Sequence, residues 1–344
     1  MPSRNLGFAV KVVCEPGLSS HDTRRWQSRP HLSVSLERLR SILDYLARVQ
    51  IGMYRLSSAL VPYGTHPDLP EFHGQLEDCA AQLAHLGSYA NELGVRLSSH
   101  PGQYVVLNSA SERVSVAAAR DVELQARLFD AMGLGADAVV VLHVGSEEGG
   151  HDAGKIRFLR AIERLSERAR ARLVIENDDR VFALEHVLEI SERTGLRVVW
   201  DVLHHHCNDP AGLPDREALQ LALGTWPAEQ TPKIHYSSPK TATEQRAAKR
   251  GRQHGRSLVL PQLRAHADMV DPVAFEWFLR YPERGLSFDT MLEARRRTPR
   301  CCACASSFRR AASGRAAMPS GHLERLSART GDERLRRESA VEGH

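Results

Sequence analysis

The sequence predicts a (β/α)8 TIM barrel built from parallel strands. Eight short runs rich in apolar and β-branched residues recur along the chain, and each but the last is followed by a stretch of helical periodicity. Several runs are continuously apolar, as strands buried on both faces should be. Eight such units over roughly 290 residues fit a barrel of ordinary size. A doubly wound open sheet is the structural alternative, but no Gly-rich phosphate loop follows the first run.

The predicted strands stand out as short apolar stretches between polar segments. The clearest contain AVVVLHVG, RLVIEND and RVVWDVLHH, which begin with uninterrupted or nearly uninterrupted apolar runs. In chain order, the predicted strands cover residues 5–12, 53–58, 96–100, 138–145, 172–178, 197–205, 232–238 and 285–294.

The predicted helices lie between these strands. In the first helix, apolar residues recur with a period of about 3.6, at Leu36, Leu39, Ile42, Leu43 and Leu46. A long basic loop precedes the last helix, which is short. In chain order, the predicted helices cover residues 33–50, 71–93, 113–132, 155–170, 184–194, 215–223 and 272–279.

The C-terminal segment departs from this pattern. We expect residues 1–297 to form the barrel domain, and residues 298–344, rich in Arg, Ala and Ser, to form a disordered tail. One short helix near 321–329 is the only periodic stretch in the tail, and no eighth barrel helix is recognisable. Three cysteines in the motif CCAC (301–304) have no second Cys or His pair at zinc-finger spacing, so we expect no structural zinc there.

Composition and charge indicate a soluble enzyme. Hydrophobic content is 42% and aromatic content 6%. We expect no membrane span and no secretion signal, and therefore a cytoplasmic location. The net charge of +4 is uneven: from Ala294 onward there are 12 Arg and 5 acidic residues, which leaves 34 basic and 37 acidic residues before it. The predicted domain is therefore mildly acidic, and the overall charge is no evidence that it binds nucleic acid.

Metal-capable side chains stand at or near the ends of six consecutive predicted strands. The carboxyl ends of parallel barrel strands face one mouth, where active sites are built. Imidazoles mixed with carboxylates suit Mn²⁺, Zn²⁺ or Fe²⁺ better than cations that prefer oxygen ligands alone. The sequence therefore predicts a metal-dependent hydrolase with seven candidate ligands: His100, His143, Glu176, Asp201, His204, His235 and Glu293.

Each candidate also has a structural interpretation. A single His at a strand end is often hydrogen-bonded within the fold, Glu176 could cap the helix that follows it, and Asp201 could simply solvate a strand end. Desolvating an unpaired carboxylate is costly, however, so repetition over six strands favours the metal site. His205, His206 and His254 are left out, because His-rich runs often lie on loop surfaces.

Several ordered motifs resemble the UV damage endonuclease family. They are LGFAV, YRLSS with VPYGTHP, SSHPGQY, VLHVG, IENDD, WDVLHHHCN, PKIHYSSPK, AHADMV and MLEA, and they span about residues 5–296. HPGQY together with K-x-H-x-S is the most specific part of the set. The resemblance implies a barrel related to those of endonuclease IV and of sugar isomerases with the same architecture.

The resemblance also implies roles for individual residues. It implies up to three divalent ions, usually manganese, with Glu176 bridging two of them and acting as a catalytic residue. It implies that Lys233 is carboxylated, sits beside the third ion and is also catalytic. Gln103 and Tyr104 match the pair that probes the duplex at the lesion, and Phe8 lies where relatives carry Tyr or Phe. The implied metal ligands are His100, His143, Glu176, Asp201, His204, His235, His266 and Glu293.

The implied reaction is ATP-independent incision of double-stranded DNA immediately 5′ of a cyclobutane pyrimidine dimer or (6-4) photoproduct, by a monomer. We expect phosphate contacts from the metals and from Lys11, Arg55 and Lys240.

A metal-dependent sugar isomerase would explain the ligands but not HPGQY. A lesion-binding protein without catalysis is the second alternative, because relatives continue past Glu293 as A-K-x-K whereas this chain has Ala294 and Arg295. The Arg-rich tail is a candidate additional DNA-binding arm.

Overall fold

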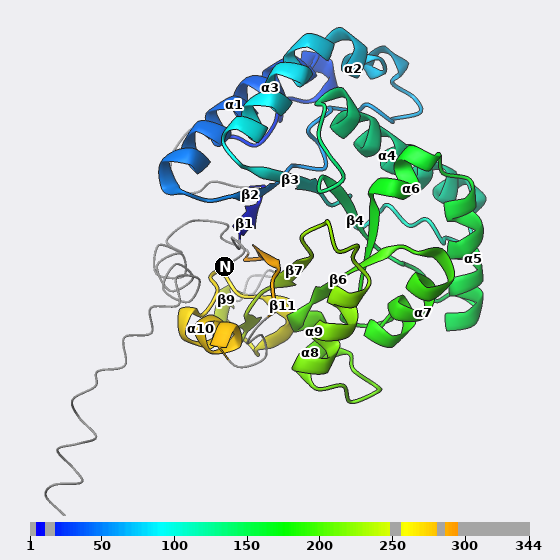
Figure 1. Ribbon diagram of the computed structural model, residues 1–344, viewed down its shortest axis with the longest axis vertical. Coiled ribbons are helices and arrows are strands. Elements are labelled where there is room, and N and C mark those ends of the chain that lie inside the picture. The colour runs from blue at the N-terminus through cyan, green and yellow to red at the C-terminus, as the bar shows by residue number, and fades with distance from the viewer. Residues whose placement is uncertain (1–4, 11–17, 248–255, 281–285, 295–344) are drawn as a thin grey trace, which may run out of the picture.

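The computed structural model describes residues 5–10, 18–247, 256–280 and 286–294. Eight parallel strands close into a barrel in the order β1-β12-β7-β6-β5-β4-β3-β2, which confirms the predicted architecture. Helices form the outer layer around these strands (Figure 1). The barrel strands are β1 (Leu6–Ala9), β2 (Met53–Arg55), β3 (Arg96–Ser99), β4 (Val139–His143), β5 (Leu173–Glu176), β6 (Arg197–Asp201), β7 (Lys233–Tyr236) and β12 (Asp289–Leu292).

The outer layer contains helices of very different lengths. The longest are α1 (Leu32–Val49), which packs through the apolar face that the sequence predicts, and α4 (Glu112–Ala131), whose buried residues belong to two core clusters. The remaining α-helices are α2 (Gln75–Asp78), α3 (Ala80–Glu92), α5 (His151–Glu163), α6 (Glu167–Arg172), α7 (Leu184–Thr194), α8 (Val202–Cys207), α9 (Asp215–Gly224) and α10 (Pro272–Arg280), and the 3-10 turns are η1 (Trp26–Ser28) and η2 (Pro70–Phe72).

Several predicted boundaries were wrong, and three of the differences divide or add a helix. The helix predicted over 71–93 is divided into α2 and α3 at Cys79. The helix predicted over 155–170 is divided into α5 and α6, because the Ser166 hydroxyl accepts a hydrogen bond from the backbone N–H of Ala169 and starts a new helix. The strand predicted over 197–205 ends at Asp201, whose carboxylate accepts from the backbone N–H of His204 and caps α8.

The long basic loop predicted after the seventh strand contains two antiparallel ribbons. In one, β8 (Pro239–Lys240) pairs with β11 (Gln262–His266), and in the other β9 (Glu244–Ala247) pairs with β10 (Arg256–Val259). The first ribbon places His266 at its end, close to the mouth of the barrel.

The barrel interior changes from charged to apolar to charged along its axis. At the amino ends of the strands, Arg96 donates to Asp289 at 2.9 Å, with both side chains buried. Above this pair, small apolar clusters that include Met53, Val141 and Met291 fill the middle. The functional side chains occupy the carboxyl end, so they lie on a packed core and not over an open pore.

Several predictions concern parts of the chain outside the described residues. They are the disordered tail over 298–344, its short helix, the CCAC motif and Arg295. Among the described residues, no helix follows β12. None of the helices in the described ranges is long and apolar enough to cross a membrane.

Candidate active site

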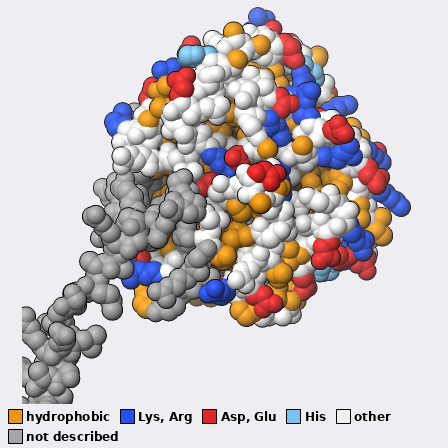
Figure 2. All heavy atoms as spheres, viewed as in Figure 1, with side chains coloured by type: hydrophobic (Ala, Val, Ile, Leu, Met, Phe, Trp, Pro, Cys, Tyr) orange, Lys and Arg blue, Asp and Glu red, His pale blue; other side chains and the backbone are white. Residues whose placement is uncertain are grey.

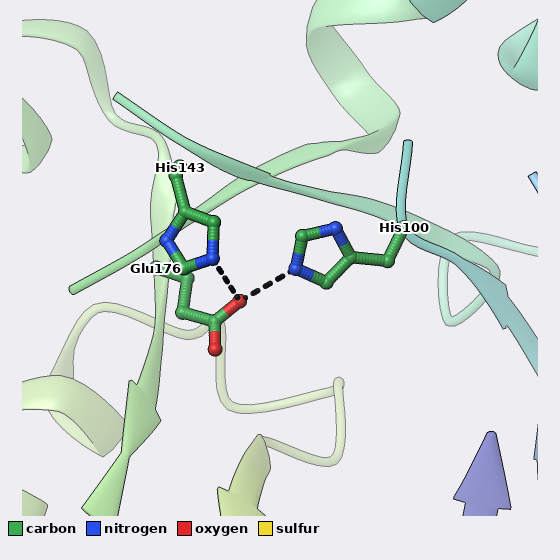
Figure 3. A group of neighbouring side chains, drawn as sticks. All are labelled: His100, His143 and Glu176. Carbon is green, nitrogen blue, oxygen red and sulfur yellow. Dashed lines mark hydrogen bonds and ion pairs between the residues drawn. The ribbon is translucent and has the colours of Figure 1, made fainter. Parts of the chain in front are cut away.

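The carboxylate of Glu176 is the hub of a histidine cluster at the carboxyl ends of the strands. His100 Nε2 lies 2.9 Å from Oε2 of Glu176, and His143 Nε2 lies 3.7 Å from the same oxygen. Figure 3 shows both rings pointing at that single oxygen from different strands. The other oxygen, Oε1, lies 2.8 Å from His235 Nδ1 and 3.7 Å from His204 Nδ1. One carboxylate thus faces four imidazoles.

A second group lies beside the hub. The candidate ligand atoms of Asp201, His204 and His266 all lie within 4.8 Å of one another, and those of Glu176, Asp201 and His235 do the same. Asp201 ends β6 and His204 lies one helical turn further on, so the strand-to-helix junction brings both to one place. Each group can hold a metal ion, as can the group of His100, His143 and Glu176.

Glu293 closes the cluster on the β12 side. One of its oxygens lies 3.4 Å from His235 Nδ1 and the other 3.6 Å from His266 Nδ1. The same carboxylate accepts a charge-assisted hydrogen bond from the Arg55 guanidinium, and both side chains are buried. All eight predicted ligands therefore converge at one end of the barrel.

The buried carboxylates are held in different charge states. Burial works to raise the pKa of Glu176, but His235 and His143 nearby and hydrogen bonds from His100 and His235 hold it well below its usual range. Burial likewise opposes ionisation of Glu293, yet the adjacent Arg55 keeps its pKa low. Burial raises the pKa of Asp201, and the charges of Glu176 and Glu293 act in the same direction. The protein groups around the three carboxylates therefore do not fully compensate their negative charge.

Most of the imidazoles favour the neutral form, which is the form that binds metals. Burial lowers the pKa of His235 to about 4 and also lowers those of His143 and His266. His204 differs: burial works to lower its pKa, but Asp201, Glu176 and Glu293 together raise it. His204 Nδ1 also lies 3.0 Å from the backbone carbonyl of Asn177, and a proton on Nδ1 leaves the lone pair on Nε2.

An unpartnered buried atom tests whether this donor set fits a metal. Asp201 Oδ2 is buried and has no hydrogen-bond partner within the described part of the chain. Leaving such an atom unsatisfied costs about 1–3 kcal/mol, more for a charged group. Divalent cations bound by mixed nitrogen and oxygen ligands would satisfy this arrangement, so the residues present fit the predicted metal centre.

Lys233 lies in the barrel interior two residues before His235. Its side chain is fully buried, and Nζ has no hydrogen-bond partner among the described residues. Burial lowers the pKa of Lys233 well below its usual range, and the cations Arg96 and Arg55 lower it further. A lysine at the start of a strand is often a surface residue, but Lys233 is buried inside the barrel.

The predicted lesion-contacting residues fall into two groups. Gln103 and Tyr104 are exposed in the loop after β3, and the Tyr104 side chain is 83% exposed. Phe8 is only 7% exposed and packs edge-on against Tyr54, with ring centroids 5.6 Å apart. It belongs to the cluster between the barrel and α1, so the structure does not bring Phe8 to a surface where DNA could touch it.

The predicted phosphate contacts need correction as well. Arg55 and Lys240 are 6% and 8% exposed, and Arg55 is already paired with Glu293. Lys11 lies outside the described residues. On the face shown in Figure 2, basic and acidic side chains are interspersed over the side covered by α4 to α7, which agrees with a nearly neutral domain.

The supporting roles of two residues, Asn177 and Arg55, were not predicted from the sequence. Asn177 is fully buried; its amide donates to the backbone carbonyl of Asp201 at 3.1 Å and accepts from the Asp201 N–H at 2.8 Å. Arg55 supports Glu293 in the same indirect way. The motif IENDD contains Asn177 directly after a candidate ligand, which was the only signal of its role in the sequence.

Fold and site together define a class: a (β/α)8 barrel with a buried histidine–carboxylate centre at the carboxyl ends of its strands. A family model described as UV-endonuclease UvdE matches residues 21–298. The chain belongs to this family.

Individual relatives agree with this assignment. A UV DNA damage endonuclease of Bacillus mycoides is 28% identical over 265 residues, which cover 76% of this chain and 77% of the relative. One from Clostridium perfringens is 32% identical over 205 residues, which cover 59% of this chain but only about half (49%) of the relative. The crystal structure of SacUVDE matches with a TM-score of 0.74 and 29% identity, covering 90% of this chain and 98% of that one.

A second structural likeness concerns the fold alone. The 3-keto-D-glucoside 4-epimerase YcjR from E. coli matches with a TM-score of 0.51 and 11% identity, covering 90% of this chain and all (100%) of that one. Sugar-converting enzymes share the barrel, as the sequence motifs imply, and the shared barrel does not identify a reaction.

Proposed function

We propose that this protein is a metal-dependent DNA repair endonuclease that incises double-stranded DNA immediately 5′ of UV photoproducts, both cyclobutane pyrimidine dimers and (6-4) photoproducts. The observation that carries the proposal is the position of Glu176, whose two oxygens face four imidazoles from four different elements. A carboxylate with imidazoles on both oxygens is suited to bridge two cations. Family membership supplies the substrate class.

Each residue of the cluster has a defined part. His100, His143 and Glu176 would hold one ion; Asp201, His204 and His266 a second; and Glu176, Asp201 and His235 supply a further group, with Glu293 beside it. Manganese is the ion we expect. Divalent ions in such a centre activate water and neutralise charge on the scissile phosphate and the leaving oxygen.

The chain itself prepares the site for this chemistry. Arg55 holds Glu293 ionised and fixes its orientation, while Asn177 orients Asp201 and His204. The carboxylates of Glu176 and Asp201 are buried, and the low local polarity strengthens their attraction to cations. Lys233, carboxylated on its amine, would add an anionic oxygen donor below His235.

Lesion recognition is assigned to Gln103 and Tyr104. Tyr104 is exposed in the loop after β3, four residues after His100. A planar ring at this position can fill the space left when damaged nucleotides leave the base stack. The reaction needs no ATP, and the protein acts as a monomer in the cytoplasm.

Nicking of supercoiled plasmid tests the proposal. Purified protein with Mn²⁺ should convert UV-irradiated plasmid to the open circular form and leave unirradiated plasmid intact. The new ends should be a 3′-hydroxyl and a 5′-phosphate. Equal nicking of both plasmids, or none with metal-loaded folded protein, would contradict it.

The two alternatives predict different results. A sugar isomerase would interconvert aldoses and ketoses in the presence of metal without nicking irradiated plasmid. A non-catalytic lesion-binding protein would bind irradiated DNA more tightly than undamaged DNA and leave it intact. The exposed ring of Tyr104, in the loop that begins with the candidate ligand His100, favours a DNA substrate over a sugar.

A further inference from the structure

The loop between β1 and α1 carries a short basic and aromatic segment that none of the assignments above uses. Residues 24–29 have the sequence RRWQSR, with three arginines, one tryptophan and no acidic residue. All six residues are exposed, and the Trp26 side chain is 46% exposed. Tryptophan is usually highly buried, so an exposed one flanked by cations indicates a binding surface.

The segment is held rigidly at both ends. Asp22, only 3% exposed, accepts from Arg24 Nε at 3.0 Å and from Arg24 Nη2 at 2.6 Å. Its carboxylate also accepts from the backbone N–H of His31 at 3.1 Å, and its own N–H donates to Ser35 Oγ at 2.9 Å. The loop is thereby fixed to the start of α1. A preordered loop loses little conformational freedom when a ligand binds.

Two cations of the segment are free to bind a ligand. Arg24 is engaged by Asp22, but the guanidinium groups of Arg25 and Arg29 have no ion pair or hydrogen bond with any described residue. The predicted domain is mildly acidic overall, and the basic residues first considered for phosphate contacts are buried or lie outside the described ranges. Arg25 and Arg29 therefore stand out as available cations.

The segment lies on the same end of the barrel as the metal ligands. It follows the carboxyl end of β1, and all eight barrel strands are parallel, so its loop borders the mouth. Arg24, together with His21 and Asp22, lines a cavity of about 470 Å³ that Tyr104 and Pro101 line from the loop after β3. The basic segment is thus next to the loop assigned to lesion recognition.

We propose that residues 24–29 bind the sugar–phosphate backbone of the duplex that flanks the lesion. Arg25 and Arg29 pair with phosphates, and Trp26 packs against the adjoining sugar and base edge. The choice of duplex DNA as the ligand rests on the proposed function; the exposed cations and the tryptophan are independent of it. Such contacts are insensitive to base sequence, so they add affinity and orientation, not lesion preference.

The salt dependence of DNA binding tests the arginines. Binding to a labelled undamaged duplex and to an irradiated duplex should be measured by anisotropy between low and physiological salt. In Arg25→Ala/Arg29→Ala, the slope of log affinity against log salt should become shallower by about 2, because two phosphate contacts are lost. Affinity should fall to a similar extent for both duplexes.

A matched control has the same charge change elsewhere. Arg160 and Arg170 are exposed in the last turns of α5 and α6, away from the mouth. The variant Arg160→Ala/Arg170→Ala should keep the slope of the unaltered protein. If both double variants show the same slope as the unaltered protein, the inference is wrong.

Fluorescence tests Trp26 directly. Adding duplex should quench the tryptophan emission of the unaltered protein, and Trp26→Phe should abolish that quench although Trp277, 56% exposed, remains. An undiminished quench in Trp26→Phe would exclude contact between Trp26 and DNA.

Nicking of irradiated plasmid, run in parallel, separates this inference from the proposed function. Absent nicking with the expected change in slope would overturn the function and support the DNA-binding segment. Normal nicking with an unchanged slope would overturn only the segment. Failure of the unaltered protein to bind any duplex would overturn both.

Discussion

Arg55 of β2 and Glu293, which follows β12, form a buried ion pair across 238 positions of sequence. The pair joins two strands that flank β1 in the barrel, and it holds a carboxylate that also faces His235 and His266. The Arg55 guanidinium, predicted to contact DNA phosphate, instead stabilises a candidate metal ligand. This relationship connects the stability of the barrel mouth to the integrity of the site.

Removal of the Arg55 charge should destabilise the protein substantially. In Arg55→Leu, Glu293 keeps a buried charge without its partner, and we expect a loss of roughly 3–5 kcal/mol in the free energy of unfolding. Urea denaturation measures it. The control Arg40→Leu removes an exposed partner of Asp44 and should cost less than about 1 kcal/mol. Similar losses in both variants would contradict the importance assigned to the buried pair.

Neutralising the hub should remove the metal while leaving the fold intact. Glu176→Gln keeps the shape of the side chain but removes the charge that faces four imidazoles. We expect a lower manganese content by elemental analysis, loss of nicking and an unchanged circular dichroism spectrum. Glu185→Gln, whose half-buried side chain lies in the first turn of α7, should retain both metal and activity. Full metal content in Glu176→Gln would refute its bridging role.

Metal removal should lower thermal stability. Protein treated with chelator leaves the buried carboxylates of the site, including the unpartnered Asp201 Oδ2, without a cation. Restoring Mn²⁺ to about 100 times its dissociation constant should raise the free energy of unfolding by about 2.7 kcal/mol, because the ion binds only the folded state. Calorimetry across a manganese titration measures this. A melting temperature independent of manganese would argue against a site formed by folding.

Loss of Asn177 should affect both stability and metal affinity. Asn177→Ala leaves the N–H and the carbonyl of Asp201 without the hydrogen bonds that the amide provides. Each unsatisfied buried group costs about 1–3 kcal/mol, and weakened support of a ligand typically lowers metal affinity by about 10–100-fold. The exposed Asn91→Ala is the control. Unchanged manganese affinity in Asn177→Ala would show that Asp201 is oriented by other groups.

Tyr104 should matter for damaged DNA and not for folding. Because the side chain is 83% exposed, Tyr104→Ala should change the free energy of unfolding by less than about 0.5 kcal/mol. Loss of ring stacking should weaken binding to irradiated duplex by about 1–3 kcal/mol, with little effect on undamaged duplex. Tyr104→Phe keeps the ring and should behave like the unaltered protein. Equal weakening on both duplexes would assign Tyr104 to general DNA binding.

The sequence by itself determined the fold class and seven of the eight candidate ligands; the eighth, His266, came from the family resemblance. Strand-forming runs alternate with helical periodicity, and this local pattern is enough to predict parallel units and their carboxyl ends. His143 and Glu176 lie at the ends of their strands, within two residues of the predicted ends. The apolar pattern did not predict the end of β6. It suggested that the strand continues past Asp201, but the Asp201 side chain caps a helix there and ends the strand.

Only the tertiary structure decided how these residues work together. Four findings depend on how distant segments are placed relative to one another. They are the central position of Glu176, the pairing of Arg55 with Glu293, the burial of Phe8, and the free guanidinium groups of Arg25 and Arg29. Periodicity reports which face of an element is buried, but not which partner meets it. Barrel closure sets those partners, because it places strands from opposite ends of the chain side by side.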